Sequence, residues 1–143
     1  MKLLLILFAL CLVQPINWLG NYNEALNEAG KAHKQILINF SGSDWCGPCI
    51  RLRKEILETE VFEKYASEHL VLVRADFPRQ KRNRLSDEQT KLNEALAERY
   101  NPEGKFPFTL LTDENGKIIK SWEGYPGGSP EGFVSQISKS ASK

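Results

Sequence analysis

Residues 35–49 read QILINFSGSDWCGPC, and the expected fold can be built outward from them. The first six residues form a mostly apolar run with two isoleucines, which predicts a buried strand over 35–40. Residues 41–45 predict a loop, and we expect a helix to begin close to Cys46. Pro48 is compatible with that helix because the amides of a first helical turn have no intrahelical partner. We therefore expect Cys46 and Cys49 to lie in the first turn of a helix that follows the strand.

The spacing of the two cysteines predicts a redox pair. Two intervening residues let both sulfur atoms meet across the first helical turn. The free amides and the partial positive charge of a helix N-terminus stabilise a thiolate, which lowers the thiol pKa and provides a nucleophile near neutral pH. We expect Cys46 to be exposed and to attack a substrate disulfide. Cys49 then resolves the mixed disulfide and releases the reduced substrate.

Two other uses of the pair are an inert disulfide and half of a zinc site. A disulfide that closes a four-residue loop stabilises little by chain entropy. Zinc needs about four ligands, and the two histidines, His33 and His69, fall on separate predicted helices. We therefore expect no metal site, and no cofactor other than the Cys46–Cys49 pair itself.

Outside this stretch, hydrophobic periodicity predicts a chain of alternating strands and helices. We expect helices at 23–34, 46–57, 60–68, 86–99 and 130–138, and strands at 35–40, 70–75, 106–112 and 117–122. Asn115-Gly116 lies in the turn between the last two strands and is a strong hairpin signal. The βαβ part favours parallel pairing and the hairpin adds antiparallel strands. The expected fold class is α/β, with a central mixed sheet flanked by helices on both faces.

The segment Trp45-Cys46-Gly47-Pro48-Cys49, placed after an apolar strand, resembles the active site of the thioredoxin family. The resemblance extends from about Asn23 to Ser138 and implies the thioredoxin fold. It further implies that the Phe106–Pro107 peptide bond is cis and faces the cysteines, and that the backbone of Phe106 binds extended substrate peptides. Gly124 resembles the family's glycine beside the substrate groove. Trp45 is expected to form an aromatic wall next to Cys46.

The sequence departs from the family at one chemically important position. Thioredoxins carry a buried acidic residue on the strand before the active site, and the matching residue here is Asn39, which cannot titrate. The loop of residues 41–44 is one residue longer than in thioredoxin itself, and the segment 77–104 is also longer than in the minimal fold.

The segment after the second strong strand carries four basic residues, namely Arg79, Lys81, Arg82 and Arg84. A solvated loop is the default interpretation, and docking onto an acidic protein partner is the alternative. The formal net charge of the chain is only +1, and no aromatic residues alternate with the basic ones, so we expect no nucleic-acid partner.

The N-terminus combines Lys2 with an apolar run that ends at Val13, which is typical of an export signal. The run is shorter than the roughly 20 apolar residues of an ordinary membrane span. We therefore divide the chain into residues 1–19, a signal peptide or membrane anchor, and residues 20–143, the thioredoxin-like domain. Trp18 and Tyr22 are expected either to pack on the domain or to lie at a membrane surface. Of the three cysteines, only Cys11 belongs to the leader.

These observations favour an extracytoplasmic thiol–disulfide oxidoreductase, which is either free in the periplasm or anchored to the membrane and facing the periplasm. A disulfide reductase is the leading expectation, because the Gly47-Pro48 pair between the cysteines resembles that of reducing family members. Its partners would be protein disulfides and a membrane-embedded electron donor. The alternatives are a disulfide oxidase or isomerase and a non-catalytic module that binds client proteins. We expect a monomer.

Overall fold

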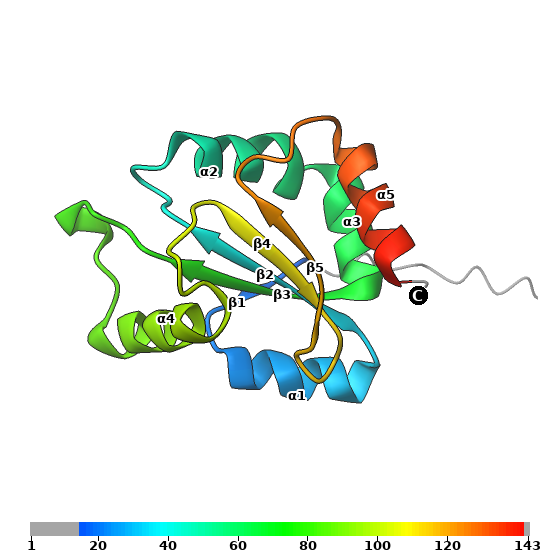
Figure 1. Ribbon diagram of the computed structural model, residues 1–143, viewed down its shortest axis with the longest axis horizontal. Coiled ribbons are helices and arrows are strands. Elements are labelled where there is room, and N and C mark those ends of the chain that lie inside the picture. The colour runs from blue at the N-terminus through cyan, green and yellow to red at the C-terminus, as the bar shows by residue number, and fades with distance from the viewer. Residues whose placement is uncertain (1–14, 142–143) are drawn as a thin grey trace, which may run out of the picture.

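The computed structural model describes residues 15–141, which form one five-stranded mixed sheet between two layers of helices (Figure 1). The strand order is β1-β3-β2-β4-β5. β3 pairs in parallel with both β1 and β2, whereas β4 pairs antiparallel with β2 and with β5. The predicted α/β class, with a mixed sheet covered on both faces, is confirmed.

The elements occur in the following order along the chain: β1 (Trp18–Leu19), α1 (Tyr22–Ala32), β2 (Gln35–Ser41), α2 (Gly47–Leu52), the π-helical turn η1 (Arg53–Leu57), α3 (Glu60–His69), β3 (Leu70–Asp76), the 3-10 turn η2 (Lys81–Asn83), α4 (Asp87–Tyr100), β4 (Phe108–Thr112), β5 (Ile118–Glu123) and α5 (Pro130–Ala141).

Alternation along β2 divides the core into two halves. Ile36, Ile38 and Phe40 pack with residues of α1 and α4 on one face of the sheet. Leu37 packs with residues of α2, η1, α3 and α5 on the other face. Because successive strand residues point to opposite faces, Asn39 shares the α2 face with Leu37. The strand before the cysteines thus places one buried polar side chain on the side where the cysteine-bearing helix lies.

Local capping explains where the helices begin. The side chain of Asn21 accepts hydrogen bonds from the amides of Asn23 and Glu24 and caps α1, and Ser86 caps α4 through the amide of Gln89. The helix predicted over 46–57 is interrupted, because its second half is the π-helical turn η1.

The two-residue strand β1 is not predicted by the sequence analysis. Trp18 pairs with Leu72 and Leu19 with Val73, and the indole of Trp18 stacks on Phe62 with ring centroids 6.5 Å apart. Of the two placements expected for Trp18, packing on the domain is therefore the one observed. The boundary expected after residue 19 stays a prediction, and β1 lies on its N-terminal side. Residues 1–14 of the expected leader lie outside the described residues.

Candidate active site

Both cysteines lie at the start of α2, a few residues after the end of β2. Cys46 is the N-cap residue of α2, and its Sγ accepts a hydrogen bond from the amide of Cys49 at 3.3 Å. The two residues form a disulfide, with their Cα atoms 5.2 Å apart. The Sγ of Cys49 lies 3.4 Å from the amide of Gly42, which donates to it. Each sulfur therefore has a backbone N–H donor, and such donors favour a thiolate over a thiol.

Exposure of the cysteines differs from expectation. Cys46 is only 5% exposed and Cys49 2%, although Cys46 is expected to be the exposed one. Cys46 is the N-cap residue of α2 and is bonded to Cys49, whereas Gly47 and Pro48 are the exposed residues of the motif. A Cβ added to Gly47 would meet no atom within 4 Å, so the space above the pair is open on that side.

Trp45 is held in one position by contacts on several sides. Its Nε1 donates to the carbonyl oxygen of Phe77 at 2.7 Å. The guanidinium carbon of Arg79 lies 3.7 Å from the centroid of its ring, and Phe106 meets it edge-on at 5.5 Å. A Cβ on Gly42 would approach the indole to 2.4 Å. Trp45 therefore forms a fixed aromatic wall in the segment that leads to Cys46.

The segment before β4 reaches the same end of the sheet. Phe108, the first residue of β4, pairs with Phe40 near the end of β2. The Phe106–Pro107 bond just before it is cis, as the resemblance implies. The carbonyl oxygen of Pro107 accepts from the amide of Gly124 at 2.8 Å. Gly124 has φ 71°, and a Cβ there would meet nothing within 4 Å. Phe106 therefore contacts the motif at Trp45, and Gly124 lies beside Pro107.

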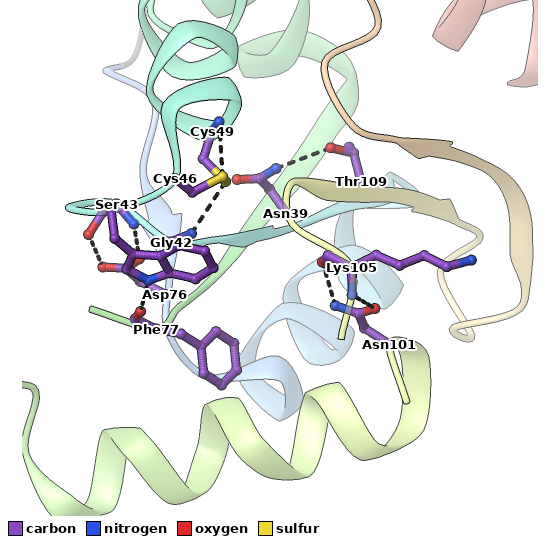
Figure 2. The surroundings of a disulfide bond; sticks show 11 residues. Asn39, Gly42, Ser43, Cys46, Cys49, Asp76, Phe77, Asn101, Lys105 and Thr109 are labelled. Carbon is purple, nitrogen blue, oxygen red and sulfur yellow. Dashed lines mark hydrogen bonds between the residues drawn. A yellow bond between two sulfur atoms is a disulfide. The ribbon is translucent and has the colours of Figure 1, made fainter. Parts of the chain in front are cut away.

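Asn39 occupies the position beside the disulfide where the family has an acid. Its side chain is 3% exposed and its Nδ2 donates to Oγ1 of Thr109 at 3.1 Å. Figure 2 shows its amide oxygen directed toward the sulfur atoms. The pair is therefore flanked by an amide that neither gains nor loses a proton in the working pH range.

Two carboxylates that the sequence analysis does not assign to the site organise the loops around it. Asp76 accepts from the amide and the hydroxyl of Ser43 (Figure 2). Asp44 accepts from the amides of Arg79 and Gln80 and from Asn83. Hydrogen bonds from the Arg79 amide and the Asn83 side chain hold the pKa of Asp44 below its ordinary value. Neither partnership has a sequence signal, because each joins residues more than 30 positions apart.

Metal-ligand clusters and membrane-spanning helices are both missing from the part of the chain that the structure describes. Within residues 15–141, no group of three or more His, Cys, Asp and Glu side chains could hold a metal ion. In the same residues, no helix is both long enough and apolar enough to cross a membrane.

A family model and one of two related proteins match this chain over most of its length. Residues 22–139 match the family model of a thioredoxin-like domain. A disulfide bond reductase of Chlamydia pneumoniae, DsbH, is 37% identical over 123 residues, which cover 86% of this chain and 71% of that protein. The thioredoxin-related protein DsbJ of the same organism is 42% identical over 62 residues, which are 43% of this chain and 18% of that protein.

A solved structure agrees with the sequence matches. The structure of a DsbH oxidoreductase superposes with a TM-score of 0.79 at 32% identity, covering 90% of this chain and 86% of that chain. Fold and sequence similarity therefore extend over nearly all of the described residues.

Proposed function

Because the chain belongs to the thioredoxin-like domain family, we propose that it reduces disulfide bonds of protein substrates outside the cytoplasm. Homology to a disulfide bond reductase, together with a Cys46–Cys49 pair at bonding distance, makes it a thiol–disulfide oxidoreductase. The observation that carries the proposal is the position of Cys46 at the N-cap of α2, with its sulfur accepting the Cys49 amide.

The proposed reaction moves two electrons from the cysteine pair to the substrate. The thiolate of Cys46 attacks one sulfur of a substrate disulfide, forming a mixed disulfide and expelling the other substrate sulfur as a thiolate, which takes up a proton. The thiol of Cys49 loses its proton to water and attacks the sulfur of Cys46, which breaks the mixed disulfide and expels the second substrate sulfur as a thiolate that takes up a proton. The Cys46–Cys49 disulfide forms and the substrate leaves as a dithiol. A reducing dithiol must then return two electrons and two protons to the pair.

The substrate contacts follow from the same geometry. Trp45 precedes Cys46 directly and its ring contacts Phe106, and the exposed Gly47 and Pro48 leave room for an extended polypeptide. Gly124 lies beside Pro107 without a side chain to obstruct that path. We assign these residues to substrate binding and the two cysteines to catalysis.

The reducing direction and the location rest on different features. Gly47 and Pro48 between the cysteines, and the similarity to a relative named as a disulfide bond reductase, favour reduction. The apolar stretch after Lys2 favours export. An exported reductase has no access to cytosolic reductant, so a membrane-embedded dithiol donor is the partner that the proposal requires.

Trapping experiments test the proposed roles of the cysteines. The full-length chain, reduced and freed of excess reductant, is mixed with insulin as a model protein disulfide. Cys49→Ser should accumulate a mixed disulfide through Cys46, whereas Cys46→Ser should form none and should lose turnover by about 100-fold or more. Retained turnover in Cys46→Ser, or no trapped species in Cys49→Ser, would contradict the mechanism.

A further inference from the structure

We infer that residues 77–85, here called the basic shelf, dock acidic side chains of the substrate polypeptide that flank the disulfide being reduced. The inference rests on the proposed reduction of protein disulfides and adds a substrate preference to it. The shelf contains Arg79, Lys81, Arg82 and Arg84 and no acidic residue. All four basic side chains are exposed.

The basic shelf adjoins the redox site directly. It follows β3, which is the parallel neighbour of β2, so both strands end at the same edge of the sheet (Figure 1). The carbonyl of Phe77 accepts from the Trp45 indole, and the Phe77 ring meets Phe106 edge-on at 5.4 Å. A polypeptide lying along Trp45 and Phe106 therefore has the shelf as its next neighbour.

The positive charge of the shelf is largely uncompensated by ion pairs. Among residues 15–141, the only ion pair from the shelf joins Arg84 to Asp87, at 3.8 Å between two side chains that are 80% and 90% exposed. Exposed pairs of this kind contribute little. The shelf carries four positive charges, and the carboxylate of Asp44, bound to the shelf backbone, offsets one of them. The chain as a whole carries only +1. The local excess creates a positive potential that an acidic partner can use.

The backbone of the shelf is held in place before any partner arrives. Asp44, one residue before Trp45, accepts from the amides of Arg79 and Gln80 and from the side chain of Asn83. Arg79 in turn lies over the Trp45 ring. This preorganisation lowers the entropic cost of docking, since the loop does not have to be ordered by its ligand.

The shelf also borders a hollow suited to a peptide. A cavity of about 410 Å³ is lined by both basic and apolar side chains, among them Phe77, Pro78, Arg79, Lys81, Arg84 and Leu85. Two carboxylates, Asp76 and Asp87, also line it, but the three basic residues of the lining outnumber them. This combination of basic and apolar side chains favours a ligand with an acidic residue next to an apolar one over a nucleic-acid phosphate backbone. Because the adjoining redox pair acts on polypeptides, an acidic peptide is the occupant that the position selects.

The test uses three synthetic peptides, each with one internal disulfide, flanked by Asp and Glu, by Ser and Gly, or by Lys. The full-length chain reduces each under excess dithiothreitol, and kcat/KM is measured at low and high salt. We expect kcat/KM for the acidic peptide to exceed that for the neutral one by about tenfold in low salt and to approach it in 1 M salt, because screening removes exposed electrostatic attraction.

Matched variants locate the preference on the shelf. The triple variant Lys81→Ala, Arg82→Ala and Arg84→Ala should reduce the neutral peptide like the wild type and lose the preference for the acidic one. The control, Lys31→Ala, Lys117→Ala and Lys139→Ala, removes the same charge from exposed positions elsewhere and should keep the preference. Circular dichroism checks that both variants are folded.

The outcomes separate this inference from the proposed function. If the wild type reduces all three peptides equally, or if the shelf variant keeps the acidic preference, the shelf is not the docking surface. The inference is equally overturned if the shelf variant loses only binding to vesicles of anionic lipid. If the wild type reduces none of the peptides, including the neutral one, the proposed function itself fails and the inference falls with it.

Discussion

Asn39 is the residue whose chemistry departs most from the family pattern, and its burial makes the departure testable. Replacing it with Asp puts a carboxyl where the amide is 3% exposed and beside the sulfur atoms (Figure 2). Desolvation disfavours the charged form and raises the pKa of that carboxyl above its unfolded value of about 3.9. The folded state then binds more protons than the unfolded state between the two pKa values, so stability falls as pH rises through that window.

The expected result for Asn39→Asp is a free energy of unfolding that falls, relative to wild type, as pH rises from the unfolded pKa of about 3.9 to the raised folded pKa. Each unit of pKa elevation within that range costs about 1.4 kcal/mol. Urea denaturation at several pH values measures it, with Asn27→Asp as the control, because Asn27 is exposed on α1. Identical pH dependence in wild type and Asn39→Asp would show that position 39 is solvated rather than buried against the redox pair.

The single carboxylate of Asp44 holds the backbone of the basic shelf through the amides of Arg79 and Gln80. Its folded pKa is lowered, chiefly by the Arg79 amide and the Asn83 side chain. Its contribution is therefore present above the unfolded value of 3.8 and is lost as pH falls through the lower folded pKa. Wild-type protection of the Arg79 and Gln80 amides should disappear only in acid.

Removing the carboxylate should abolish this protection at every pH. In Asp44→Ala, the Arg79 and Gln80 amides should exchange with solvent deuterium several-fold faster at neutral pH, as measured by NMR. Asp87→Ala is the control, since Asp87 is also a carboxylate near the segment but pairs with the side chain of Arg84. Unchanged exchange rates in Asp44→Ala would mean that other contacts order the segment.

At the scale of the elements, the turn between β4 and β5 packs against Tyr22 of α1 and Tyr100 of α4. Gly116 has φ 84°, and a Cβ there would lie 2.5 Å from the Tyr22 hydroxyl and 2.8 Å from that of Tyr100. The two hydroxyls are 2.7 Å apart, and that of Tyr100 donates to the Gly116 carbonyl. Burial raises the pKa of Tyr22 well above its ordinary value, so this phenol stays protonated at working pH.

Gly116→Ala combines a strained backbone with a steric clash. We expect it to lower the free energy of unfolding by roughly 2–4 kcal/mol, as measured by urea denaturation. Gly128→Ala is the matched control, since Gly128 has φ 74° and open space around it; it should show only the strain, about 1 kcal/mol. Equal losses in the two variants would mean that the tyrosine hydroxyls move aside freely.

The elements also show what a sequence can predict. The strand before the motif, the helix after it and the hairpin are predictable because each has a local cause, namely β-branched residues, Pro48 in a first turn and Asn115-Gly116. β1 is not, because two residues gain their conformation only by pairing with β3. The π-helical turn that forms the second half of a predicted helix has no periodic signal that separates it from an α-helix.

At the scale of the whole molecule, the position of the redox pair follows from topology. β2 and β3 run in parallel, so the residues after each strand meet at one edge, where the end of β2 also pairs with the start of β4. Spacing alone predicts the pairing of Cys46 with Cys49, and the family resemblance predicts the cis bond before Pro107. Neither predicts the contacts that hold Trp45, because those contacts depend on how distant loops assemble.

The reduction potential of the Cys46–Cys49 pair distinguishes a reductase from a disulfide-forming enzyme. The full-length chain is equilibrated in dithiothreitol or glutathione buffers of defined ratio, and the fraction of reduced pair is measured by thiol labelling. We predict a value near that of thioredoxin, about −270 mV, which suits a reductase fed by a strong donor. A value near about −120 mV, which is typical of a disulfide-forming enzyme, would contradict the proposed function.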